Sequence, residues 1–105
     1  MLIPDRTRPL IESVSIGKVP IYGQTSASTG SAVQLSTTSL ELKNGLIVQA
    51  LSANTATVFI GGSTVNNTTG FELQAGQATS VGINNVNKLY VYGATGNGVC
   101  WIGAV

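Results

Sequence analysis

The sequence predicts an all-β fold, a sandwich or a barrel, and three observations support this prediction. Short runs rich in β-branched and aromatic residues alternate with turn residues at intervals of about eight to twelve positions. No window combines a capping residue with the three- and four-residue apolar spacing of a helix. Thirteen glycines in 105 residues are too many for helix interiors. A chain of this length forms one domain.

The first part of the chain differs in composition from the rest. Residues 1–12 hold four charged side chains and two prolines, Pro4 and Pro9, which favour extended backbone. Two interpretations are open: a frayed terminus followed by an edge strand, or an extended arm that docks on a neighbouring subunit. We adopt the arm, because prolines beside apolar residues suit a neighbour's groove. Residues 23–31 are predicted to be a polar linker, so the chain divides into an arm and linker (1–30) and a β-sandwich body (31–105).

The body is expected to contain strands near residues 32–36, 46–51, 57–60, 71–75, 78–83, 88–92 and 99–105, and a short strand or extended turn at residues 40–42. Its central stretch, residues 45–61, is interpreted as a hairpin with a turn at residues 53–55, where Asn54 tolerates left-handed backbone. Residues 44–50 resemble residues 87–93, and the return strands 58–61 and 100–103 also align. The same hairpin is therefore predicted twice, either in facing sheets or side by side.

Composition and charge exclude several function classes. Hydrophobic residues make up 43% of the chain and charged residues only 9%, with a net charge of +1. This gives no electrostatic footprint for nucleic acid or anionic lipid. No run approaches the roughly 20 apolar residues of a membrane span. The N-terminus also lacks the features of a secretory signal, so we expect synthesis in the cytoplasm.

The residues needed for catalysis are missing or scattered. The chain has no histidine, which removes the usual general base and the commonest metal ligand. Glu41 and Glu72 are interpreted as outward strand residues rather than a catalytic pair. The single cysteine, Cys100, is expected to be a small buried hydrophobic residue. We therefore expect a protein that is not an enzyme and holds no cofactor or metal.

Aromatic residues are the remaining candidates for a binding site. Tyr90 and Tyr92 are predicted to share one strand face, and together with Trp101 they could form a stacking platform for a sugar or a base. Packing against the other sheet or at a subunit interface is the favoured alternative, because tyrosine combines an apolar body with a polar tip.

Three segments of the body carry a resemblance to a known family. They are Leu42–Ser63, which contains Ala-Asn-Thr and ends in Gly-Gly-Ser, then Gly70–Gly76, and finally Val86–Val91. In order and spacing they resemble small virion proteins of tailed bacteriophages. The resemblance extends from about Ser31 to Tyr92, and residues 1–30 match less clearly.

This resemblance implies a jelly-roll-like antiparallel β-sandwich on the outside of a phage head, or in a tail or fibre component. We expect a capsid decoration (cement) protein that binds the outer surface of the major capsid protein lattice and stabilises the head, as a homo-oligomer with a trimer favoured. Its location would be the virion. The alternatives are a host-adhesion or carbohydrate-binding module that recognises host glycans, and a tail or connector ring component. The candidate partner-binding residues are Ile3, Pro4, Arg6, Arg8, Pro9, Leu10, Tyr90, Tyr92 and Trp101.

Overall fold

The computed structural model of the chain describes residues 19–105, which form eight strands and one short turn of 3-10 helix. Apart from that turn, these residues contain no helix, and the predicted all-β class is confirmed. The elements are β1 (Pro20–Ser26), β2 (Val33–Gln34), β3 (Leu46–Ala50), β4 (Val58–Gly61), β5 (Phe71–Leu73), β6 (Ala78–Val81), η1 (Val86–Lys88), β7 (Tyr90–Tyr92) and β8 (Gly98–Ala104).

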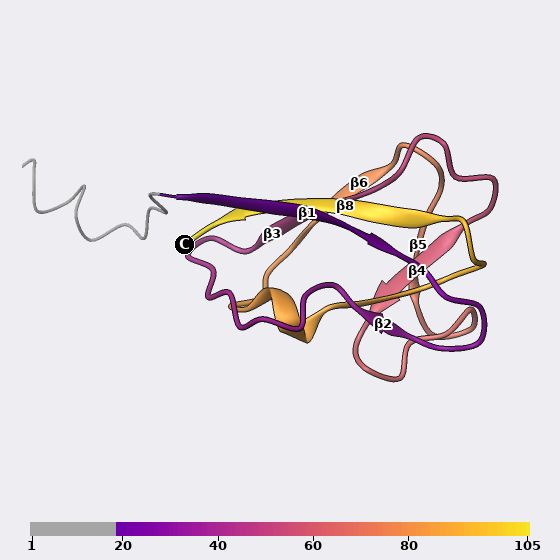
Figure 1. Cartoon of the computed structure of the whole chain (residues 1–105), viewed down its shortest axis with the longest axis horizontal. Helices are drawn as coiled ribbons and strands as arrows, with labels where there is room; N and C mark the ends of the chain where they lie inside the picture. Colours follow the sequence, from indigo (N-terminus) through magenta and orange to yellow (C-terminus); the bar gives the residue numbers. More distant parts are fainter. Residues whose placement is uncertain (1–18) are drawn as a thin grey trace, which may run out of the picture.

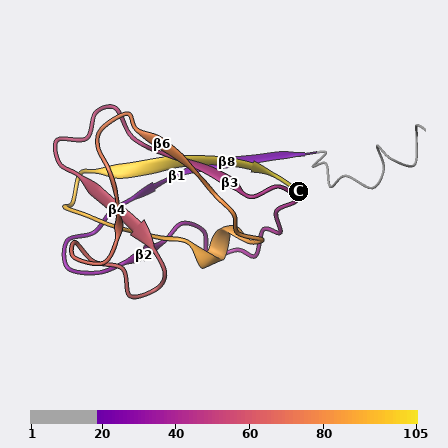
Figure 2. The ribbon, with the colours of Figure 1, turned by 180° about the vertical axis from the view of Figure 1, so that it is seen from behind.

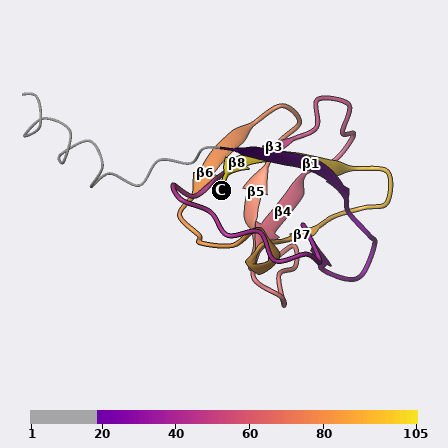
Figure 3. The same cartoon turned by 60° about the vertical axis from the view of Figure 1, so that its left-hand side comes forward.

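The strands form two four-stranded sheets, both antiparallel throughout. Sheet A has the order β1-β8-β3-β6, and sheet B has the order β2-β7-β4-β5. Figure 3 shows the two layers one above the other. The first strand thus pairs with the last, the second with the seventh, the third with the sixth and the fourth with the fifth. In Figures 1 and 2, β1 and β8 run side by side along the length of the molecule.

The core lies between the sheets and consists of aliphatic side chains that alternate with outward residues. In β3, Leu46, Val48 and Ala50 are buried while the residues between them are exposed, as the two-residue period of a strand requires. Val58, Val91 and other branched residues complete the core from sheet B and β8. Trp101 also points inward, and its indole N–H donates a hydrogen bond of 3.3 Å to Thr25 Oγ1.

Strand β1 corrects the predicted boundary between linker and body. Residues 23–26 were expected in the polar linker, yet they continue β1, which pairs with β8 over seven positions. Gly23 lies opposite Trp101, and a Cβ atom there would come within 2.7 Å of the indole. The glycine makes room for the indole instead of marking a flexible linker. The body therefore begins by residue 20, and residues 1–18 of the predicted arm and linker (1–30) lie outside the described residues.

The hairpin predicted over residues 45–61 does not form. Strand β3 lies in sheet A and β4 in sheet B, so the segment between them crosses from one sheet to the other. The similar second segment crosses back, from β7 in sheet B to β8 in sheet A. The two segments pair with each other, β3 with β8 and β4 with β7. Neither predicted arrangement of two complete hairpins is therefore correct.

Two asparagines tie these crossing segments together. The side chain of Asn54 accepts a hydrogen bond from Gly98 N and donates one to Gly98 O, both of 2.9 Å. In the opposite direction, Asn97 Oδ1 accepts hydrogen bonds from Thr55 N at 2.7 Å and Ala56 N at 3.2 Å. Each asparagine therefore binds the backbone just after the other, and we call this arrangement the asparagine clamp.

Two smaller predictions have different outcomes. At Asn44-Gly45, where a turn is expected, the chain bends, and Gly45 has a φ of +82°, a value that favours glycine. Of the short strand or extended turn expected at residues 40–42, the strand is not formed. This stretch makes an isolated bridge between Glu41 and Asn85, and Leu42 N donates a hydrogen bond of 2.8 Å to Asn84 O.

Candidate functional site

The outer surface of sheet A is the most distinctive exposed surface of the described chain. Tyr22, Ile102, Ile47 and Ser80 lie directly beside one another in a row that crosses all four strands. The exposed fractions are 75% for Tyr22, 48% for Ile102 and 51% for Ile47. The adjacent row contains Gln24, Cys100, Gln49 and Ala78. We call these two rows the A face.

The A face carries no charge. The charged residues within the described range 19–105 are Glu41, Lys43, Glu72 and Lys88, and none of them occupies a strand position in sheet A. Two hollows of about 380 and 100 Å³ flank Ile47 and Ile102. Contiguous apolar surface of this kind, without charges that keep it in water, is typical of an interaction surface.

Cys100 belongs to this face and not to the core. It was expected to be buried, but it points outward from β8 between Gln24 and Gln49 and is half-buried. Its thiol lies 3.6 Å from Gln49 O as a weak donor. The neighbouring Val99 and Trp101 are the inward residues, so the alternation of the strand assigns Cys100 to the other side.

The outer surface of sheet B carries the other aromatic residues. Tyr90 and Tyr92 flank the buried Val91 and therefore share one face of β7, as the sequence predicts. Phe59 of β4 lies opposite Tyr92, with ring centroids 6.5 Å apart and planes inclined at 57°. This tilted arrangement is a favourable aromatic contact, and all three residues are half-buried.

Trp101 does not join the two tyrosines. It lies on the inward side of sheet A and is only 8% exposed, while the tyrosines point outward from sheet B. The platform that combined these three aromatic residues is therefore not formed. The other candidate partner-binding residues (Ile3, Pro4, Arg6, Arg8, Pro9 and Leu10) lie outside the described residues.

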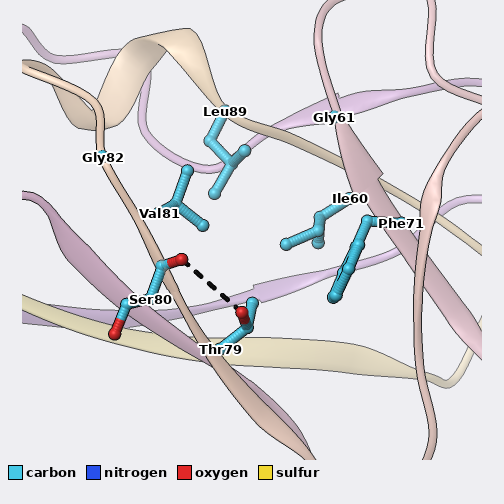
Figure 4. A pocket seen from close by; sticks show the side chains of 8 residues that line it. All are labelled: Ile60, Gly61, Phe71, Thr79, Ser80, Val81, Gly82 and Leu89. Carbon is cyan, nitrogen blue, oxygen red and sulfur yellow. Dashed lines mark hydrogen bonds between the residues drawn. The ribbon is translucent and has the colours of Figure 1, made fainter.

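A pocket of about 350 Å³ opens between the edge strands β5 and β6. Figure 4 shows Ile60 and Phe71 on one side, Thr79 and Val81 on the other, and Leu89 near one end. Phe71 is 58% exposed although it pairs with the buried Ile60 and belongs to the inward side of sheet B. Its ring is exposed because sheet A ends at β6 and leaves this side of the sandwich open.

The described residues show no arrangement typical of metal binding. Residues 19–105 contain no group of three or more cysteine or carboxylate side chains placed to hold a metal ion. Glu41 and Glu72 are both exposed and lie on separate elements, before β3 and within β5.

No protein-family model, curated protein or solved structure matches the chain. In the part of the chain that the structure describes, no helix has the length and apolar character needed to cross a membrane.

Sequence reasoning did not identify the A face, although a signal was present. Most strands alternate apolar and polar residues, but Leu46-Ile47-Val48 and Trp101-Ile102 are apolar at consecutive positions. Continuous apolar runs are typical of strands covered on both faces. In this chain they occur in the central strands of both sheets, β3 and β8 in sheet A and β4 and β7 in sheet B, and those of β3 and β8 supply the apolar residues of the A face.

Proposed function

We propose that the protein is a structural virion protein of a tailed phage, a decoration protein that binds the outer surface of the major capsid protein lattice through its A face. The observation that carries this proposal is the charge-free apolar row of Tyr22, Ile102 and Ile47 across a four-stranded sheet. The resemblance of three body segments to small phage virion proteins supplies the class of partner.

The strand order supports a jelly roll, the fold that this resemblance implies. The strands pair as β1 with β8, β2 with β7, β3 with β6 and β4 with β5. This is the pattern of one long antiparallel ribbon that is folded into two sheets. Eight strands in a double sheet are typical of jelly rolls, which are common in capsid proteins.

The proposed mechanism is association without chemistry. A specific stable interface buries about 800 Å² on each partner. In the proposed complex the A face forms the centre of that area. Each copy would add a modest binding free energy at its position on the shell. Because the position repeats over the whole lattice, many modest contacts together would stabilise the particle.

The test is binding to shells assembled from the major capsid protein of the same genome. We expect the wild-type chain to sediment with the shells and to saturate them. Ile102→Lys should weaken binding at least about tenfold, because it places an unpaired ammonium group inside an uncharged interface. Ser63→Lys is the matched control, since Ser63 is an exposed loop residue away from sheet A, and its binding should be unchanged.

Two results would contradict the proposal at different levels. If the wild-type chain does not bind the shells, the decoration role is wrong. If wild type and Ile102→Lys bind equally well, the A face is not the contact surface. Circular dichroism of both lysine variants establishes that each is folded before binding is measured.

A further inference from the structure

The four edge strands of the sandwich are not equally protected. An edge strand presents unpaired peptide groups, and proteins usually protect it with proline, with charge or by making it short. In sheet B, β2 has only two residues, and β5 has three residues with Glu72 at its centre. In sheet A, β1 begins with Pro20 and contains no further proline and no charged residue. The segment around β6, residues 77–82, contains no proline and no charged residue at all.

The register of β6 shows which of its peptide groups are free for a partner. Ala50 N donates to Gln77 O at 2.8 Å, and Val48 and Leu46 face Thr79 and Val81. In an antiparallel ladder, alternate residues direct both backbone groups to the same side. The peptide N–H and C=O groups of Thr79 and Val81 therefore point to β3, while those of Ala78 and Ser80 point away from the sheet.

We propose that two copies of the chain join edge to edge through β6, about a two-fold axis beside Ser80, to form one continuous eight-stranded sheet. At the axis, Ser80 pairs with Ser80 of the partner subunit, and Ala78 lies beside the end of the partner's strand. Ser80 and Ala78 have small side chains, so they allow the strands to approach. Because the edge has no charge, a copy meets no like charge when it pairs with itself.

The open pocket beside β6 provides a second, independent reason for this partner. Phe71 and the pocket walls Ile60 and Val81 lie under the free edge of β6. Extending the sheet past β6 would cover this opening, and the two-fold axis would bring Phe71 of each copy towards the same junction. A second copy of the chain would thus pair with the unprotected edge of β6, close the uncharged pocket and cover the exposed ring of Phe71. A two-fold contact of this kind is self-complementary and closes as a dimer.

The experiment measures the mass of the full chain by light scattering after size exclusion, over a range of concentrations. We expect a dimer for wild type and a monomer for Ser80→Pro, which removes the N–H at the axis. Since the Ser80 N–H points away from β3, this proline spares the hydrogen bonds within the sheet. Gln24→Pro is the matched control: its N–H is likewise directed outward, at the opposite edge of sheet A, and this variant should stay dimeric.

A second variant keeps the test valid if prolines at strand edges reduce folding. Ser80→Lys places two ammonium groups opposite each other across the axis and should raise the dissociation constant at least about tenfold, while Gln24→Lys should not. A wild-type monomer at about 100 µM would overturn the inference, since a stable interface associates well below that concentration. A wild-type trimer, which the phage resemblance favours, would also overturn it, because a two-fold contact closes at two copies. The inference does not depend on capsid binding, which Ile102→Lys tests separately.

Discussion

Replacing Asn97 with alanine tests whether the asparagine clamp stabilises the sandwich. The side chain is 4% exposed and makes three hydrogen bonds: its Oδ1 accepts from Thr55 N and Ala56 N, and its Nδ2 donates to Ala94 O at 3.1 Å. Each bond contributes about 1 kcal/mol net, and a polar group left without a partner costs about 1–3 kcal/mol. Part of that cost is recovered where water reaches the exposed Thr55 and Ala56. We therefore expect Asn97→Ala to lower the free energy of unfolding by about 2–4 kcal/mol.

The assay is equilibrium urea unfolding, followed by the fluorescence of the single tryptophan. With an m-value of about 1–3 kcal/mol/M, the expected loss moves the midpoint by about 1 M or more. Asn66→Ala is the matched control, because Asn66 Oδ1 also accepts two backbone hydrogen bonds, from Thr68 N and Thr69 N, but within its own exposed loop. If both variants lose the same stability, the position of Asn97 between the crossing segments gives no special stabilisation, and the reasoning is refuted.

Two further predictions concern the core and the A face. Gly23→Ala should destabilise the protein by about 1–3 kcal/mol, because the new Cβ would lie 2.7 Å from the indole of Trp101. The control Gly62→Ala has no atom within 4 Å of the new Cβ and should change stability by less than about 0.5 kcal/mol. Thermal melts of both variants measure the difference. Capsid binding should change less than about threefold between 50 and 500 mM salt, because the A face is uncharged; a drop of about a hundredfold in pelleting assays would indicate a charged interface instead.

The sequence was sufficient to predict the class of fold and most of the strands. Alternation of apolar and polar residues reports which side of a strand is buried, and this is a local property. It placed β3, β4, β7 and β8 close to their observed positions. It failed over the second half of β1, residues 23–26, where glycine and small polar residues suggested a linker. The glycine at position 23 is explained only by the indole of Trp101, which lies far away in sequence and opposite it in the sheet.

The candidate site was harder to predict, because it depends on how strands are combined. Each strand of sheet A supplies two outward residues to the A face, and Tyr22, Ile47 and Ile102 come from three different strands. Only the registers between strands bring them into one row. The same limit explains the incorrect grouping of Trp101 with Tyr90 and Tyr92. All three are aromatic residues in strands, but whether Trp101 points into the core or outward depends on the packing of sheet A.

The repeated segments explain why a hairpin was the natural but incorrect interpretation. A strand, a turn containing asparagine and a second strand describe a hairpin and a crossing between sheets equally well, since both need a polar bend between apolar runs. The structure differs in its pairing: each half of one segment pairs with the opposite half of the other, β3 with β8 and β4 with β7. Asn54 and Asn97 then occupy equivalent positions, and each binds backbone that follows the other. The similarity of the two segments therefore reflects a two-fold arrangement within one sandwich, in which neither crossing is complete without the other.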